Sequence, residues 1–191
     1  KIVTGPEAAG VIDINASTKV NIQAVAKAKR MSVSDITVVV LNRPRHDLLL
    51  KEIREAGARI RLIQDGDVAA AIETARPDTG IDLLMGIGGT PEGVITAAAM
   101  ICLGGHIQGK LHPKDADEKA RAQAAGHDLN KVLTTRDLVN SDDVFLSATG
   151  ITDGELLRGI RYMSYGSISE SLVMRGKSQT VRLIQTEHHL K

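Results

Sequence analysis

Apolar residues in the first half of the chain fall into short runs separated by amphipathic segments. Three runs rich in aliphatic residues predict strands, at 35–41, 58–63 and 81–85. The first run is β-branched and almost continuously apolar, which is typical of a strand covered on both faces. Three segments predict helices that follow these strands, at 46–57, 68–75 and 91–103.

Residues that end or begin helices support these boundaries. Gly57 stands where a helix C-cap glycine is expected, and the pair Arg76-Pro77 ends the second helix. Pro91 suits the first turn of the third helix. Strands separated by such helices favour a mainly parallel sheet, in which ligands bind at the carboxyl ends of the strands. We therefore expect the three turns that follow the strands to converge.

The second half of the chain has a different pattern. Residues 111–133 are charged and alanine-rich and predict a solvated helical excursion. Residues 143–150 predict another buried strand. The stretch 160–184 alternates in polarity and breaks at Gly166 and Gly176, which predicts antiparallel strands joined by short turns. The chain is thus predicted to be an α/β protein with layered helices, a largely parallel or mixed sheet and a carboxy-terminal antiparallel portion.

Composition narrows the possible functions. With 42% hydrophobic residues among 191, the chain can bury a core as one domain or as a large piece of one. A net charge of +1 gives no global attraction for nucleic acid or anionic membranes, and 2% aromatic residues leave little to stack on bases. No apolar run approaches the roughly 20 residues of a membrane-spanning helix. Cys102, the single cysteine, predicts a reducing compartment and hence a cytoplasmic protein.

An arginine turn follows the first predicted strand, at Arg43, Pro44, Arg45 and His46. A proline between two arginines at a strand end makes a rigid cationic pair, and guanidinium groups match phosphate oxygens in bidentate geometry. The turn is therefore a candidate phosphate site. A solvated basic turn is the alternative.

An aspartate turn follows the second predicted strand, at Asp65, Gly66 and Asp67. Two carboxylates one residue apart can accept hydrogen bonds from sugar hydroxyls or reach a hard cation such as Mg²⁺. The alternative is a tight turn whose last aspartate caps the following helix.

A glycine turn follows the third predicted strand, at 86–93, with the sequence GIGGTPEG. Glycines there let the backbone approach an anionic ligand, and the helix N-terminus adds free N–H groups. The spacing fits neither a Rossmann nor a Walker fingerprint. Glu92, in the first helical turn, is either a partner of the helix dipole or a metal ligand.

Other polar clusters give weaker signals. The histidines form no H-x-x-x-H pair, and His188-His189 is interpreted as part of the tail of the chain. Ser147 has no evident base partner, which argues against a serine hydrolase. Candidate chemistry is thus concentrated in the three turns.

The three turns belong to a longer ordered set of motifs. The set comprises GPEAAGVIDIN at 5–15, VVVLNRPRH at 38–46, IQDGDV at 63–68, LMGIGGTPEG at 84–93, LGGHIQG at 103–109 and ATGITDG at 148–154. In this order the motifs closely resemble the class II (GlpX-type) fructose-1,6-bisphosphatases. The resemblance covers most of the chain and is weakest at 111–133.

The resemblance implies part of a lithium-sensitive sugar-phosphatase-like fold. It implies hydrolysis of the 1-phosphate of fructose 1,6-bisphosphate with Mg²⁺ or Mn²⁺. The resemblance also implies that the protein binds a small-molecule sugar bisphosphate and forms a homo-oligomer. Arg43, Pro44, Arg45, Asp65, Gly66, Asp67 and Gly89 would bind substrate, and Glu92 would bind metal.

Members of this family also have an amino-terminal half that carries most of the metal-binding carboxylates. Residues 1–191 match the carboxy-terminal portion, and the chain begins with Lys1 instead of Met. We therefore expect the chain to be a piece of a longer enzyme and to be inactive alone. Two alternatives are a dual phosphatase that also accepts sedoheptulose 1,7-bisphosphate and a non-catalytic module that binds sugar phosphates.

Overall fold

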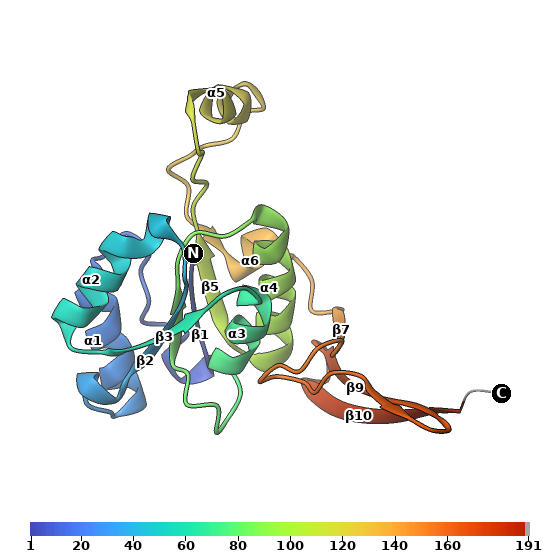
Figure 1. Ribbon diagram of the computed structural model, residues 1–191. Coiled ribbons are helices and arrows are strands. Elements are labelled where there is room, and N and C mark those ends of the chain that lie inside the picture. The colour runs from blue at the N-terminus through green and yellow to red at the C-terminus, as the bar shows by residue number, and fades with distance from the viewer. Residues whose placement is uncertain (190–191) are drawn as a thin grey trace.

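Two sheets and the helices packed on them make up residues 1–189, the part of the chain that the computed structural model describes (Figure 1). The first sheet has six strands in the order β3-β2-β4-β1-β5-β6. They are β1 (Ile2–Thr4), β2 (Thr37–Leu41), β3 (Arg59–Ile63), β4 (Leu83–Met85), β5 (His106–Gly109) and β6 (Leu133–Thr134). The three strands predicted in the first half of the chain, β2, β3 and β4, are confirmed.

The first sheet is mixed. Strand β2 pairs in parallel with β3 and with β4, as the alternation of strands and helices predicts. Strand β1 lies between β4 and β5 and runs antiparallel to both, and β5 is antiparallel to β6. The sequence pattern did not predict β1, because a run of three residues carries too little periodicity to be recognised.

The helices are α1 (Thr18–Lys29), α2 (Asp47–Ala56), α3 (Asp67–Thr74), α4 (Thr90–Leu103), α5 (Ala116–Ala124) and α6 (Thr135–Leu138). Short 3-10 turns lie at Pro6–Ala8, Val33–Asp35 and Pro44–His46. Gly57 ends α2 in the left-handed conformation, with φ of 86°, so the predicted C-cap is confirmed. Among residues 1–189, none of the helices combines the length and the apolar character that crossing a bilayer requires.

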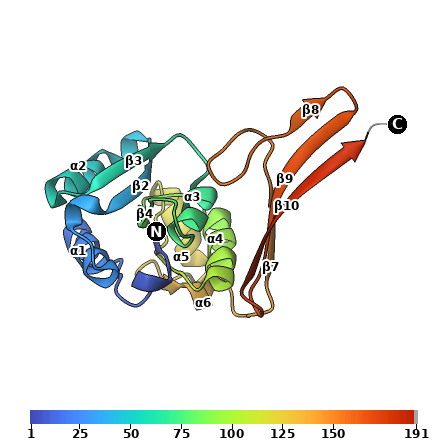
Figure 2. The same ribbon diagram turned by 90° about the horizontal axis from the view of Figure 1, so that it is seen from below.

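The first sheet is covered on both faces (Figure 2). Val38 and Val40 of β2 pack into a cluster with residues of α1 and α2, such as Ile22 and Ile53. Val39 points the other way and joins residues of α3 and α4. This alternation confirms that β2 is a strand buried on both faces.

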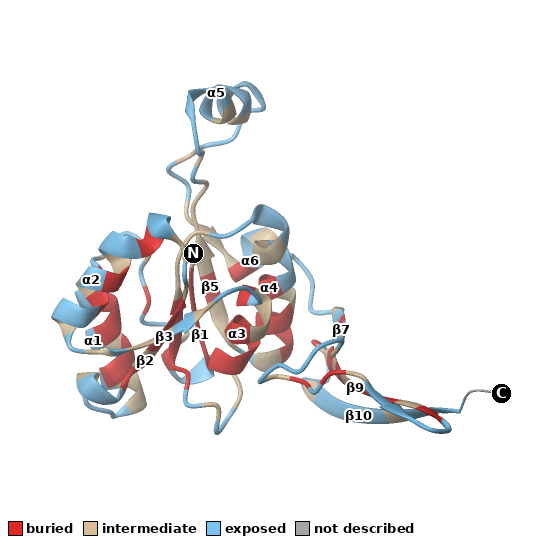
Figure 3. Cartoon of the chain, in the orientation of Figure 1, coloured by how far each residue is buried: buried red, intermediate tan, exposed pale blue. Residues whose placement is uncertain are grey.

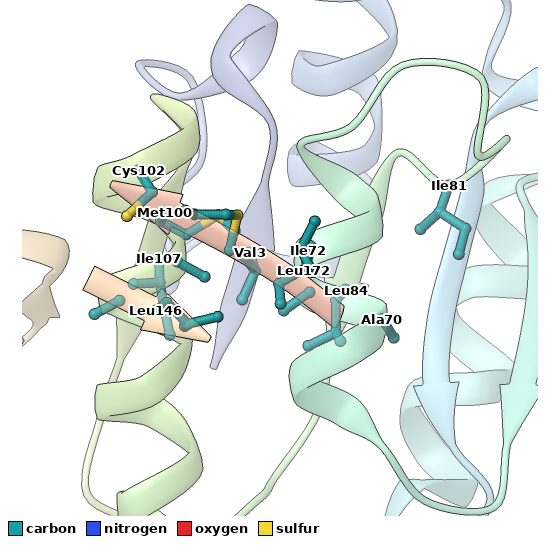
Figure 4. Packing of buried hydrophobic residues seen from close by; sticks show 14 of the residues in the cluster. Val3, Ala70, Ile72, Ile81, Leu84, Met100, Cys102, Ile107, Leu146 and Leu172 are labelled. Carbon is teal, nitrogen blue, oxygen red and sulfur yellow. The ribbon is translucent and has the colours of Figure 1, made fainter. Parts of the chain in front are cut away.

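The second sheet lies beyond α4. It consists of β7 (Phe145–Thr149), β8 (Arg161–Met163), β9 (Gly166–Arg175) and β10 (Thr180–His189). Strand β9 pairs antiparallel with the other three, as predicted for this stretch. Leu146 and Leu172 of this sheet pack with Met100 and Cys102 of α4, so one core joins the two sheets (Figure 4).

Three predictions for the second half need correction. Strand β7 is buried on one face, because Leu146 points into the core while Phe145 is 64% exposed. His188 and His189 belong to β10 and not to a tail: His188 Nε2 lies 3.0 Å from Ser169 Oγ across the sheet. The charged stretch 111–133 contains one helix of nine residues, α5, between irregular segments that hold it away from the sheets (Figures 1 and 3).

Candidate functional site

The three predicted turns meet at one edge of the first sheet. Leu41 of β2 pairs with Ile63 of β3, and Val39 of β2 pairs with Leu84 of β4. Because these pairings are parallel and in step, the carboxyl ends of the three strands lie side by side. The convergence expected from the order of strands and helices is therefore what the structure shows.

The arginine turn and the glycine turn are joined directly. Arg45 donates from Nη2 to Ile87 O at 2.8 Å and from Nε at 3.3 Å. The next residue, His46, accepts from Ile87 N–H at 2.8 Å. Arg43 donates to the neighbouring carbonyl of Asn42 at 2.8 Å. One edge of the Arg45 guanidinium is therefore occupied by the glycine turn, while its exposed side remains open to a ligand.

The aspartate turn lies against the glycine turn through Asp67. Its Oδ2 would be 2.6 Å from a Cβ added at Gly88, so the absence of a side chain there permits the approach. Gly66, with φ of 75°, is the N-cap residue of α3, and in the described part of the chain no side chain caps this helix. The alternative in which the last aspartate of the turn caps the helix is therefore wrong. Asp65 is exposed.

Asp67 forms a buried ion pair that the sequence pattern did not predict. Lys1 Nζ donates to Asp67 Oδ2 at 2.5 Å, and the two side chains are 8% and 11% exposed. Lys1 is placed there by the start of the central strand, since its backbone N and O are bonded to Gly86 at 2.8 and 3.1 Å. One oxygen of Asp67 is thus committed to a cation, which leaves the second oxygen for a ligand.

Glu92 has a free buried oxygen. In the first turn of α4 its side chain folds back over Gly89, so that a Cβ added at Gly89 would overlap Glu92 Oε2. This oxygen is buried and has no hydrogen-bond partner among residues 1–189. A buried carboxylate oxygen without a partner is costly in a protein, and a hard cation such as Mg²⁺ or Mn²⁺ would satisfy it. The oxygen therefore fits the role of a metal ligand.

A complete metal centre requires more donors than these. Within residues 1–189, no group of three or more His, Cys, Asp or Glu side chains is placed to share one ion. Among the described residues, Glu92 is therefore a candidate for a single cation ligand and not part of a complete site.

A cleft of about 710 Å³ opens beside the glycine turn. One wall consists of Lys1, Arg45 and the glycine turn, and the other consists of residues of the excursion that carries α5. The cleft is basic: it is lined by Lys1, Arg45, Lys110, His112, Lys114 and His127, with Glu118 as the one acidic side chain among its lining residues. Figure 1 shows this excursion standing above the end of the sheet where Lys1 lies. The stretch 111–133, predicted as a solvated excursion, thus also forms a wall of the candidate site.

Comparison with known proteins identifies the family. Residues 1–188 match the family described as "Bacterial fructose-1,6-bisphosphatase, glpX-encoded". The "Fructose-1,6-bisphosphatase class 2" of Haemophilus influenzae is 42% identical over 203 aligned positions, which cover all of this chain and 61% of the relative. The "Fructose-1,6-bisphosphatase 1 class 2" of Escherichia coli K12 is 43% identical and is covered over 60% of its length. The chain therefore spans about three fifths of these relatives, and it belongs to the glpX-encoded, class 2 fructose-1,6-bisphosphatase family.

Proposed function

We propose that the longer protein containing this chain hydrolyses fructose 1,6-bisphosphate to fructose 6-phosphate and phosphate, using Mg²⁺ or Mn²⁺. The observation that carries the proposal is the convergence of the three turns: Arg45 and the glycine turn line one basic cleft, and Asp67 of the aspartate turn lies against Gly88 behind it. The names of two relatives more than 40% identical over the whole chain supply the reaction.

Phosphate recognition is assigned to the basic side chains at the cleft. Arg45 is held beside the glycine turn by its bonds to Ile87 O, and Pro44 fixes the backbone between it and Arg43. Lys110 and Lys114 add positive charge from the opposite wall. A sugar with two phosphate groups carries negative charge at both ends, so a cleft with cations on two walls suits it better than a neutral sugar.

Sugar recognition is assigned to the aspartate turn and to Gly89. Asp65 is exposed, and Asp67 has one oxygen outside its ion pair, so both can accept from sugar hydroxyls. The backbone of Gly66 has no side chain to obstruct a ligand. Gly89 is the N-cap residue of α4, next to the first backbone N–H groups of the helix, which have no acceptor within the helix itself.

The metal role is assigned to Glu92. When bound, a divalent ion would polarise the phosphoryl group and lower the pKa of an attacking water. Glu92 would hold such an ion through its unpartnered oxygen, which lies next to Gly89. The other carboxylates would be supplied by the part of the relatives that this chain does not cover.

We further propose that the chain forms the carboxy-terminal part of a lithium-sensitive sugar-phosphatase-like fold in a cytoplasmic homo-oligomer. The two sheets with helices packed between them support the fold assignment. Cys102 is buried and unbridged, as expected in a reducing compartment. The oligomer rests on the family resemblance alone.

The test is phosphate release from fructose 1,6-bisphosphate with Mg²⁺, with Mn²⁺ and without either metal, on residues 1–191 and on the full-length protein. We expect metal-dependent release from the full-length protein and none from residues 1–191. Sedoheptulose 1,7-bisphosphate in a parallel assay separates a dual phosphatase from a specific one. If the full-length protein binds the sugar phosphate but releases no phosphate with either metal, the hydrolase proposal is wrong.

A further inference from the structure

Both backbone polar groups of Ile87 are bonded to side chains of the arginine turn. The Ile87 N–H donates to His46 Nε2 at 2.8 Å. The Ile87 carbonyl accepts from Arg45 Nη2 at 2.8 Å and from Nε at 3.3 Å. Two consecutive residues therefore bind the two peptide groups on either side of the Ile87 Cα, more than 40 positions further along the chain.

The His46 ring is fixed in orientation and protonation. It is 1% exposed, and its Nδ1 lies 2.7 Å from Leu41 O, an atom that can only accept. Nδ1 must therefore carry the proton, which leaves Nε2 as the acceptor for Ile87 N–H. The ring thus spans from the last residue of β2 to the glycine turn after β4, with a backbone partner at each nitrogen.

Gly86 accommodates the ring. Its φ of 146° lies in a region that residues with a side chain rarely adopt. A Cβ added there would lie 3.1 Å from His46 Nε2 and 3.3 Å from Cε1. The His46 ring therefore fits against the turn only because Gly86 has no side chain.

We propose that His46 is a positioning residue for the substrate site. It sets the conformation of the turn from Gly86 to Gly89, and through that turn it places the Gly89 backbone at the cleft that Arg45 also lines, with Glu92 packed against Gly89. The identity of the ligand rests on the proposed function, but the grip on Ile87 does not. A histidine that merely fills the core would need no acceptor aligned with a backbone N–H.

Two substitutions of similar size distinguish a histidine that positions the glycine turn from one that only fills space in the core. In His46→Gln the side-chain oxygen can reach the position of Nε2 and still accept from Ile87 N–H. In His46→Asn the shorter amide can reach the position of Nδ1 and still donate to Leu41 O, but it leaves Ile87 N–H without a partner. Both variants introduce an amide into the same buried site, so each is a matched control for the other.

The experiment measures three quantities in the full-length protein: hydrogen exchange at the Ile87 amide, KM and kcat for fructose 1,6-bisphosphate, and the midpoint of thermal unfolding. Losing one buried hydrogen bond at a binding turn changes affinity on the order of tenfold. We expect His46→Asn to expose the Ile87 amide and raise KM by about that factor, with a smaller change in kcat. His46→Gln should keep the amide protected and KM within about threefold of wild type.

The inference is overturned if both variants lower the unfolding midpoint equally while KM stays the same. It is also overturned if His46→Asn exposes the Ile87 amide without changing KM. A wild-type protein that releases no phosphate would refute the proposed function instead. In that case hydrogen exchange at the Ile87 amide alone tests the positioning role of His46. Equal protection of this amide in the two variants would refute that role.

Discussion

Gly89→Ala should displace Glu92, the proposed metal ligand, without unfolding the protein. Gly89 has φ of −69° and ψ of 154°, a conformation that alanine adopts freely. The added methyl would overlap Glu92 Oε2 and lie 2.9 Å from Glu92 Cδ. Since the overlapping atoms are the far end of a flexible side chain, the carboxylate should swing away and the backbone should stay.

The effect of Gly89→Ala on folding stability should be small, and its effect on metal affinity should be large. Alanine is a poorer N-cap residue than glycine, which destabilises the folded state by roughly 0.5–1 kcal/mol. Alanine also lowers the conformational entropy of the unfolded chain, which stabilises the folded state by about 0.4–1 kcal/mol. The net change in unfolding free energy should therefore be about zero, within ~1 kcal/mol. A site requires its ligand atoms to lie within about 0.5 Å of their productive positions. Mutations that disturb the residues around a metal typically lower the metal affinity roughly 10- to 100-fold.

The assay is phosphate release by the full-length protein across a Mn²⁺ titration, with thermal unfolding measured in parallel. We expect the Mn²⁺ concentration at half-maximal activity to rise on the order of 10- to 100-fold. Gly10→Ala is the control, because a Cβ added there meets nothing within 4 Å. A Gly89→Ala variant with the wild-type Mn²⁺ dependence would refute the reasoning, since Glu92 would then have no role at the metal.

Three further predictions address single side chains. Glu92→Ala in the full-length protein should abolish metal-dependent phosphate release while leaving the unfolding midpoint near wild type; retained turnover would remove Glu92 from the metal site. Lys1→Met and Asp67→Asn each break the buried ion pair and should each lower the free energy of unfolding in urea by roughly 3–5 kcal/mol, because the other residue of the pair is left buried without its partner. The double variant should cost less than the sum, and strict additivity would show that the pair is not coupled. Burial raises the pKa of Glu73, with Arg61 opposing the shift, so its protonated form is favoured in the folded state. The stability linked to Glu73 is therefore present at low pH and is lost as pH rises through the raised pKa, so Glu73→Gln should stabilise the protein more at pH 7 than at about pH 4; an equal effect at both would contradict this.

The predictions from sequence succeeded where short-range rules decide the structure. The apolar run of β2, the helical spacing of α2 and the left-handed Gly57 at its end depend on neighbours within a few residues. The antiparallel pattern of the last strands follows from alternation with period two and from two glycine breaks. The shared edge of the three turns followed from a general rule on parallel strands, without knowledge of any contact.

The predictions failed where distant segments decide the structure. Strand β1 is too short to be recognised alone, and it becomes a strand because β4 and β5 flank it. The burial of one face of β7 depends on which side meets α4, and strand propensity cannot supply that information. His188 lies in a long strand because ten successive pairs with β9 extend to that end of the sheet.

The sequence by itself determined the main parallel strands and their helices, the three turns rich in Arg, Asp and Gly, and the ordered motifs that resemble one phosphatase family. The tertiary structure alone decided how those turns work together. It placed Lys1 on Asp67, His46 and Arg45 on Ile87, and the Glu92 oxygen over Gly89. These contacts join residues up to 66 positions apart. Their energies depend on burial and geometry that exist only after the chain has folded, so no local pattern could have predicted them.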